Sequence, residues 1–474
     1  MLTYSFEHRG NESLYEYLYR QIKNDINSHK LKSNEKLPSK RALAKHLNIS
    51  TITVENAYSQ LMAEGYIYSI PRSGFYVSDI YADGHNYNFK NEKTIDNQDV
   101  HKRDINMADQ LESYFIDFVS NNTATDNFPF SSWAKLLRET MANDKDSLMI
   151  KSPSFGIYPL RCAIVNYLYQ FRGIDVEPEQ IVVGAGTEYL YGLIIQLLGH
   201  NSIYAVEDPG YQKIARIYKA NNVDCVHIPL DENGINVEAL EQSQADVLHI
   251  TPSHHFPTGI VTPINRRHEI LTWASQSKER YIIEDDYDSE FRLLGKPIPA
   301  LQSIDVSDKV IYINTFSKSL TSTIRISYMV LPKSLIVKYN KELSFYACTV
   351  SNFEQYTLAK FIEEGYFEKH INRMRNYYRK VRDILIEYIN NREQEKRCRI
   401  MEENAGLHFL LWVDTRCSDE ELVKRAAQEG VNISCLSQYY IDKSKVKDHT
   451  LVINYSGVDP DIAPEGINRL FKVF

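Results

Sequence analysis

The chain has 474 residues, more than one typical domain holds, so two or three packed units are expected. Its hydrophobic fraction of 43% is ordinary for a globular protein. No run of about 18 apolar residues occurs, and the N-terminus lacks the pattern of a signal peptide, so we expect a cytoplasmic protein without a membrane partner. The six cysteines lie far apart without a CxxC pair, which argues against a disulfide framework and a metal site.

Charge is spread unevenly along the chain, whose formal net charge is −8. Residues 1–80 carry 10 Lys and Arg against 8 Asp and Glu, whereas the remainder carries 44 against 54. A mildly basic N-terminal part joined to an acidic body is compatible with a localised contact to DNA. The difference is small, so charge alone does not assign this partner.

Residues 1–79 are predicted to form a first domain of three helices and a β-hairpin. Apolar residues recur at helical spacing in three segments, and a turn of Pro, Arg, Ser and Gly joins two alternating runs. The expected elements are a helix over 12–29, a helix over 40–47 with Ser39 as N-cap, a helix over 51–64 capped by Ser50 or Thr51, and strands over 66–70 and 75–77.

Residues 80–112 are polar without a sustained period, which predicts a linker. From residue 113 onward, apolar strands alternate with helical patterns for some 220 residues, which favours a mostly parallel α/β sheet. The expected strands are 180–183, 202–206, 247–250, 281–283 and 310–313.

The final part of the chain, residues 333–474, is predicted to be a smaller α+β unit within the body 113–474. It opens with a long helical stretch, 334–390, and continues with strand-like runs at 408–413 and 450–455.

Residues 37–77 read LPSKRALAKHLNISTITVENAYSQLMAEGYIYSIPRSGFYV. This segment resembles the winged helix of GntR-type regulators, whose pattern is LPS-x-R-x-LA, then S-x-x-TV, L-x-x-EG and G-x-x-V. The resemblance implies a winged helix-turn-helix that binds double-stranded operator DNA, with helix 51–64 in the major groove. Thr51 stands where many members have arginine. The residues expected to contact DNA are Ser39, Arg41, Ser50, Thr51, Thr53, Arg72 and Gly74.

The segment Asn314-Thr315-Phe316-Ser317-Lys318-Ser319-Leu320 comes directly after the strand 310–313. A lysine at the mouth of a sheet, flanked by hydroxyl residues, suits a Schiff base to an aldehyde cofactor. Thr315 and Ser317 can donate to a phosphate, and Arg325 can bind it through two hydrogen bonds. For the lysine alone, a solvated surface position is the alternative.

Three further segments favour a cofactor site. A carboxylate in Glu284-Asp285-Asp286-Tyr287 can pair with a protonated pyridine nitrogen. A glycine-rich turn before a helix, Gly184-Ala185-Gly186-Thr187, offers backbone N–H groups to a phosphate. Tyr211, in Glu207-Asp208-Pro209-Gly210-Tyr211, can stack on a ring, although a buried structural tyrosine is an equal alternative.

Together these segments resemble fold-type I aminotransferases, and with the head they identify the chain as a member of the MocR/GabR family of regulators. The fold that this implies is a winged helix-turn-helix joined to a fold-type I transferase domain, with a large mostly parallel sheet and a small C-terminal α+β unit. The implied cofactor is pyridoxal 5′-phosphate, with its Schiff base on Lys318, Asp285 at the ring nitrogen, Tyr287 at the 3′ oxygen and Tyr211 on the ring. The cofactor residues are Gly186, Thr187, Tyr211, Asp285, Tyr287, Thr315, Ser317, Lys318 and Arg325.

The sequence departs from ordinary aminotransferases at the substrate side. Phe256 precedes Pro257-Thr258-Gly259, where enzymes of this fold usually have asparagine, and the run 451–456 lacks the usual carboxylate-binding arginine. GABA-sensing relatives hold their ligand with arginines, and Lys213 is the candidate effector-binding residue here, although lysine does not replace arginine in bidentate binding.

Two interpretations of the body remain open. As a sensor, it responds to the cofactor or to a small amine or amino-acid effector and changes DNA affinity. As a working aminotransferase, it uses the head only for localisation. The departures favour the sensor. The resemblance also implies a homodimer that binds two half-sites.

Overall fold

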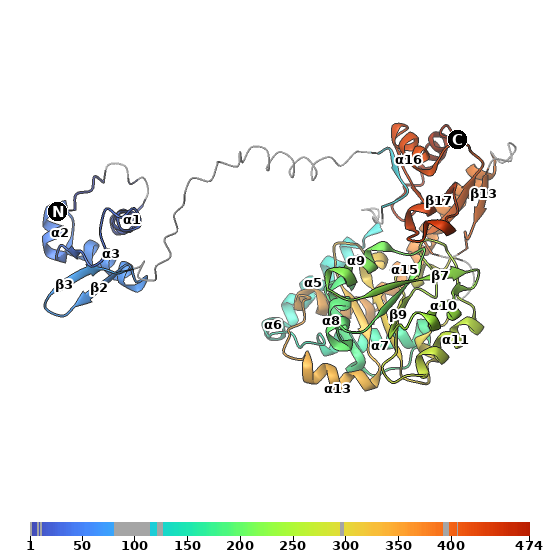
Figure 1. Ribbon diagram of the computed structural model, residues 1–474, viewed down its shortest axis with the longest axis horizontal. Coiled ribbons are helices and arrows are strands. Elements are labelled where there is room, and N and C mark those ends of the chain that lie inside the picture. Colours follow the sequence, from blue (N-terminus) through green and yellow to red (C-terminus); the bar gives the residue numbers. More distant parts are fainter. Residues whose placement is uncertain are drawn as a thin grey trace. The chain divides into compact units, whose positions relative to one another are not determined.

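The structure is a computed structural model that describes residues 2–6, 9, 12–79, 114–120, 127–293, 298–391, 398–404 and 406–474. The chain divides into two compact units, Met1–Gln110 and Leu111–Phe474 (Figure 1). The predicted linker over 80–112 lies outside the described residues. No helix in the described part of the chain is long and apolar enough to cross a membrane.

The N-terminal unit is a winged helix, as predicted. Its three helices pack around one apolar core that includes Leu18, Leu43 and Tyr58. The helices are α1 (Leu14–Asn27), α2 (Lys40–Leu47) and α3 (Thr51–Ala63), and an antiparallel sheet of order β1-β3-β2 is made by β1 (Lys36–Leu37), β2 (Ile67–Ile70) and β3 (Gly74–Val77).

Serine hydroxyls begin all three helices of this unit. Ser13 forms a capping box with Glu16, Ser39 accepts from the Ala42 amide at 3.2 Å, and Ser50 accepts from the Thr53 amide at 3.1 Å. Each cap satisfies an amide that lacks an intrahelical partner. Ser50, rather than Thr51, is therefore the N-cap of α3, and the other N-cap prediction, Ser39, is confirmed.

The body is built on a mixed, mostly parallel sheet of eight strands in the order β5-β12-β11-β10-β9-β6-β7-β8. Within it, β12 runs antiparallel to both of its neighbours, and β8 runs antiparallel to β7. The strands are β5 (Ile181–Gly184), β6 (Tyr204–Asp208), β7 (Cys225–Asp231), β8 (Gly234–Ile235), β9 (Val247–Ile250), β10 (Tyr281–Asp285), β11 (Val310–Thr315) and β12 (Ser327–Val330).

Helices cover both faces of this sheet. Side chains alternate between the faces along each strand, so neighbouring strand residues belong to different apolar clusters. One face carries Ile283, Ile311 and Met329 and packs on α8 (Thr187–Leu198), α9 (Gln212–Ala220) and α13 (Lys333–Glu342). The other face packs on α7 (Tyr158–Arg172), α14 (Asn352–Glu363) and α15 (Tyr366–Asn390) at one end and on α10 (Val237–Gln242) and α11 (Ile264–Ser275) at the other.

The stretch expected to be one long helical region, 334–390, is three helices, α13, α14 and α15. Ser351 caps α14, and Gly365 adopts a left-handed conformation, with φ of 75°, between α14 and α15. Because that conformation disfavours residues with a Cβ, the glycine marks a true helix boundary. The helix α14 packs on α5 (Phe130–Asn143) as well as on α7.

A second, four-stranded antiparallel sheet forms the C-terminal end of the body (Figure 1). Its order is β13-β14-β17-β16, from β13 (Cys398–Met401), β14 (His408–Val413), β17 (Thr450–Asn454) and β16 (Ser434–Cys435). Beside it, β15 (Val431–Asn432) pairs in parallel with β4 (Ile116–Asp117), so the first strand of the body joins residues from its C-terminal part.

Candidate functional site

A cavity of about 260 Å³ lies at the carboxyl edge of the large sheet. This position follows from the topology, since loops that leave the carboxyl ends of parallel strands meet at one edge. The antiparallel strand β12 presents its amino end to the same edge, where Ser327 pairs with Thr315 and with Gly184. That reversal brings Arg325 beside the ends of β5 and β11. The cavity is lined by the expected residues Thr187, Tyr211, Lys213, Asp285, Tyr287, Thr315, Ser317, Lys318 and Arg325.

The three consecutive carboxylates at the end of β10 point in different directions. Asp285 has the same strand parity as Ile283, on the face of α8 and α9, so it faces the cavity. Glu284 and Asp286 face the opposite side. Oδ2 of Asp285 accepts a 2.5 Å hydrogen bond from the Tyr191 hydroxyl and lies 3.6 Å from Nε2 of His249. Oδ1 is buried, and no donor among the described residues reaches it.

Lys318 lies three residues beyond β11, in the short helix α12 (Phe316–Ser319). Burial lowers the pKa of its amino group to about 8, although the nearby Asp288 carboxylate opposes this shift. A lysine with such a pKa supplies a larger fraction of neutral, nucleophilic amine at neutral pH than a solvated one.

Thr315 is buried and caps α12, because its hydroxyl accepts from the Ser317 amide at 3.1 Å. The same oxygen accepts from the Ser327 hydroxyl at 2.8 Å and donates to the Ser317 hydroxyl at 3.0 Å. Its expected role with a phosphate therefore remains a prediction, whereas its role in holding α12 is visible.

Gly186 begins α8 with φ of 91°, a conformation that favours glycine. A Cβ at this position would collide with the Arg325 guanidinium, so the absent side chain lets arginine lie against the helix start. No side chain that the structure describes caps α8, so its first amides stay available to an anion. Gly186, Thr187 and Arg325 thus form a cradle of donors at one end of the cavity.

The carboxylate of Glu188 lies beside this cradle and pairs with two cations. Its Oε1 is bonded to Nζ of Lys213, and its Oε2 lies 2.9 Å from Nη2 of Arg325. The hydrogen bond from Lys213 is the main cause that lowers the pKa of Glu188. Lys213, the candidate effector-binding residue, is consequently paired within the protein.

Aromatic side chains form another wall. Tyr211 is 47% exposed, and its ring centroid lies 6.0 Å from that of Phe256. Phe256 also contacts Tyr439 edge-to-face at 5.2 Å. The hydroxyl of Tyr287 lies 3.2 Å from Nδ1 of His254, which is in turn 2.8 Å from Oδ2 of Asp288.

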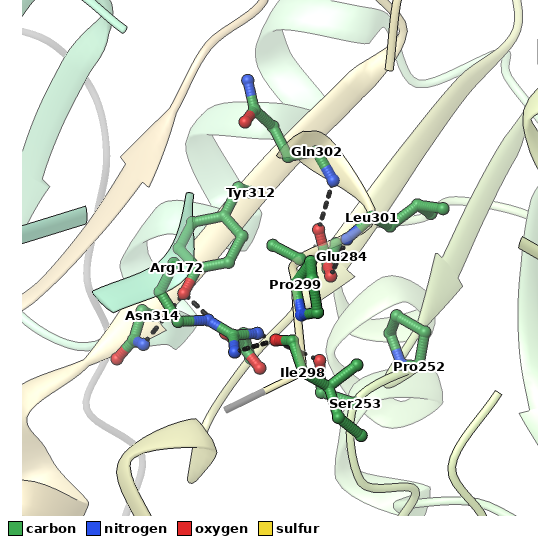
Figure 2. Close-up of polar contacts among 12 residues, drawn as sticks. Arg172, Pro252, Ser253, Glu284, Ile298, Pro299, Leu301, Gln302, Tyr312 and Asn314 are labelled. Atoms are coloured by element: carbon green, nitrogen blue, oxygen red, sulfur yellow. Dashed lines mark hydrogen bonds and ion pairs between the residues drawn. The ribbon is translucent and has the colours of Figure 1, made fainter. Parts of the chain in front are cut away.

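A buried polar cluster behind the sheet holds β10 and β11 in place. Arg172 Nη2 lies 2.7 Å from Oδ2 of Asp286, which also accepts a 2.6 Å hydrogen bond from the Tyr312 hydroxyl. The amides of Leu301 and Gln302 donate to Glu284 at 2.7 and 2.9 Å (Figure 2). Burial is the main cause that raises the pKa of Glu284, to about 7. These contacts fix the strand end from which Asp285 projects the other way.

In the winged helix, the expected DNA residues lie around α2, α3 and the hairpin turn. Arg41, Thr51 and Arg72 are exposed, and Arg72 adopts φ of 62° in the turn. The hydroxyls of Ser50 and Thr53 lie 2.8 Å apart. Ser39 and Ser50 combine exposure with their capping role, and Gly74 begins β3.

Two family models match the chain. "Bacterial regulatory proteins, gntR family" matches residues 14–77, and "Aminotransferase class I and II" matches residues 114–470. The chain is 40% identical over 457 residues to the HTH-type transcriptional regulator YdeL of Bacillus subtilis strain 168, covering 96% of each chain. It is 30% identical to the probable rhizopine catabolism regulatory protein MocR of Rhizobium meliloti, covering 97% of this chain and 94% of that relative.

The chain belongs to the MocR family of transcription regulators. Its MocR-type body shares the fold of a kynurenine aminotransferase from Pyrococcus horikoshii, with a TM-score of 0.66 and 25% identity over 79% of this chain and 93% of that structure. The predictions of family and fold class are confirmed.

Several residues that line the cavity of this MocR-family protein were not predicted from the sequence. Tyr191 lies one turn after Thr187 on α8. Residues four apart share a helix face, so a helix predicted from Thr187 onward would have placed Tyr191 beside the cofactor residue Thr187. His249 lies on β9 with Asp285 nearby, and Glu207 ends inside the cavity, bonded to the Thr251 amide and hydroxyl. Burial raises the pKa of Glu207 to about 8. The pairing of Glu188 with two cations had no local signal.

Proposed function

We propose that the body of this MocR-family regulator binds pyridoxal 5′-phosphate at Lys318, and that the cofactor or an amine reacting with it changes the affinity of the winged helix for DNA. The observation that carries the proposal is the convergence of Lys318, the unpaired buried oxygen of Asp285 and the donor cradle around Arg325 on one cavity. These three sites match the aldehyde, the pyridine nitrogen and the phosphate of pyridoxal phosphate, respectively.

The residues fit this cofactor. In the described part of the chain no donor reaches Oδ1 of Asp285, and a protonated pyridine nitrogen would supply one. Arg325, the first amides of α8 and Ser317 suit a phosphate. When bound, pyridoxal phosphate supplies an aldehyde that condenses with a primary amine and an electron-withdrawing ring.

The chain's own groups then have separate tasks. Lys318 offers its neutral amine from a partly buried position, with Asp288 nearby. Tyr191 holds Asp285 through Oδ2 and thereby aims Oδ1. Tyr211, which lines the cavity and is exposed, would cover the ring of the bound cofactor, and Tyr287 would bind its 3′ oxygen.

For DNA, α3 acts as the recognition helix, and its composition bears on specificity. Thr51–Ala63 contains no Lys or Arg, so bidentate contacts to guanine from this helix are absent. Ile52 is 68% exposed beside Thr51, and Asn56 is exposed one turn later. An aliphatic side chain suits a thymine methyl group, and an asparagine suits adenine, so α3 favours A·T pairs. Arg41 and Arg72 supply phosphate and minor-groove contacts.

A homodimer completes the proposal, because a winged helix of this kind binds two half-sites. The body exposes large apolar side chains, which a second copy of the chain would cover. They include Phe130, Met149, Ile150 and Phe345, with exposures of 60, 75, 66 and 70%.

The test uses the full chain and an operator selected by it from a random duplex library. Operator affinity is measured with and without pyridoxal phosphate, in wild type and in Lys318→Ala, with the exposed Lys341→Ala on α13 as control. We expect a borohydride-reducible yellow band and a cofactor-dependent affinity in wild type and the control, and neither in Lys318→Ala. If neither the cofactor nor any amine changes affinity or transcription, the body is not a sensor, and turnover of amino donors would make it a working aminotransferase.

A further inference from the structure

The cations that face the cavity are already matched by protein carboxylates. Among the described residues that line it, Lys213, Lys318 and Arg325 are the only Lys and Arg. Glu188 contacts two of them, with one carboxylate oxygen on each. The side chains of Glu188, Lys213 and Arg325 are 40, 50 and 49% exposed, so this cluster faces the open part of the cavity.

Glu188 is a permanent anion at neutral pH, because its pKa is lowered chiefly by the Lys213 hydrogen bond and further by Arg325. If a phosphate takes Arg325, Glu188 still holds Lys213. No cation is therefore released for a second anionic group. Lys318, which remains, lies partly buried in α12, three residues beyond β11, and is assigned to the cofactor's aldehyde.

The other cavity walls also disfavour an anion. Asp285 and Asp288 line the cavity. Burial lowers the pKa of His408 well below its ordinary value, so this imidazole stays neutral. On the side of the small sheet, the wall is apolar: Phe256 and Tyr439 pack on a cluster that contains Leu410 and Val452. A carboxylate placed there would lose its hydration without gaining a partner.

We propose that the second ligand of this cavity is a primary amine without a carboxylate, and that Glu188 enforces this choice by occupying Lys213 and Arg325. The amine's apolar part lies against Phe256 and Tyr439, and its cationic form approaches a cavity rich in carboxylates. Glu188 acts as a specificity-determining residue, since it rejects carboxylated ligands by taking the cations that would bind them. This inference rests on the proposed function of the body.

The test measures dissociation constants by calorimetry with the full, cofactor-loaded chain. Each ligand pair differs only by a carboxylate: phenethylamine and phenylalanine, tryptamine and tryptophan, butylamine and norvaline. In wild type, we expect at least one amine to bind at least tenfold more tightly than its carboxylated counterpart. Glu188→Gln should improve binding of the carboxylated ligand at least tenfold, because Lys213 is then free, whereas the amine should gain no affinity.

Two further variants identify the cause. Glu188→Gln combined with Lys213→Ala should abolish the gain. Glu421→Gln is the matched control, because Glu421 is paired with Arg425, is 47% exposed and lies outside the cavity. It should retain wild-type selectivity.

The outcomes separate this inference from the function on which it rests. If wild type holds the cofactor on Lys318 but binds carboxylated ligands as tightly as the amines, or binds no amine of the panel, the inference is overturned and the cofactor proposal stands. If borohydride fixes no cofactor on Lys318, the proposed function itself fails. The comparison of amines with carboxylated ligands in wild type needs no variant. It therefore tests the inference even if Glu188→Gln does not fold.

Discussion

The Tyr191 hydroxyl donates a 2.5 Å hydrogen bond to Oδ2 of Asp285 and leaves Oδ1 of the same carboxylate buried without a donor among the described residues. The arrangement predicts that Asp285→Ala weakens pyridoxal phosphate binding at least tenfold, because a charge-assisted bond in a buried site is lost. Tyr191→Phe should weaken it less, since only the orienting bond disappears. Tyr204→Phe is the control, because the buried Tyr204 hydroxyl has no partner in the described structure. Equilibrium dialysis gives the dissociation constants, and an unchanged value for Asp285→Ala would remove the assignment.

Cofactor capture by Lys318 should depend on pH with a midpoint near 8. Burial disfavours the charged ammonium and lowers its pKa to about 8, so the neutral amine that reacts increases as the pH rises through that value. Asp288 opposes the shift, so Asp288→Asn should move the midpoint lower. The rate of borohydride-fixed incorporation, followed against pH, measures it. A midpoint near the ordinary lysine value of about 10.4 would contradict the assigned environment.

Gly186→Ala should weaken cofactor binding by at least tenfold, because the added methyl group collides with the Arg325 guanidinium at the phosphate cradle. Gly192→Ala is a matched control within the same helix, α8, where an added Cβ meets no atom within 4 Å. The control should bind pyridoxal phosphate with wild-type affinity. Its free energy of unfolding should rise slightly, since alanine is a better helix former than glycine. Fluorescence titration with pyridoxal phosphate distinguishes the two, and equal affinities would exclude the cradle.

Arg172→Met should lower the unfolding free energy of the body by about 3–5 kcal/mol, because Asp286 is left as an unpaired buried carboxylate. All three tryptophans of the chain, Trp133, Trp273 and Trp412, belong to the body, so their fluorescence in urea follows this unit alone. Adding Asp286→Leu should recover part of the loss, since the unpaired charge is then absent. A loss below about 1 kcal/mol in the single variant would contradict the buried-pair argument.

Arg41→Ala and Arg72→Ala should each weaken binding to all duplexes and reduce the salt slope by about one. Asn56→Ala should instead lower discrimination between A·T and G·C variants of the operator, since it removes a contact to a base edge. Arg20→Ala gives the control variant, because Arg20 lies on α1 and is paired with Glu12. Binding isotherms at several salt concentrations separate the two behaviours. If Asn56→Ala lowers affinity without changing base preference, α3 does not select bases through this residue.

Many helices, strands and helix caps could be predicted from local sequence patterns. The caps at Ser39 and Ser50 and the strands at 247–250 and 408–413 were readable because each depends on neighbouring residues and on period. The split of 334–390 into three helices was missed, since apolar spacing alone does not show how chain direction changes at Gly365.

The candidate site divides in the same way. Lys318, Asp285 and Gly186 were accessible through segments that follow strands, helped by family resemblance. The contacts of Arg325 depend on the reversed direction of β12, and those of Glu188 depend on the starts of α8 and α9 meeting at the cavity. These contacts are properties of the tertiary structure, as are the inward positions of His249 and Glu207.

The antiparallel strand β12 has a consequence for the life of the protein in a cell. One ligand at this edge would touch the ends of β5, β10 and β11 and the start of β12, segments that are far apart along the chain. Binding only to the folded body adds about 2.7 kcal/mol of stability at a hundredfold excess over the dissociation constant. Proteases degrade unfolded chains, so the amount of this regulator in the cell would rise and fall with the concentration of pyridoxal phosphate. This effect would be independent of any change in operator affinity.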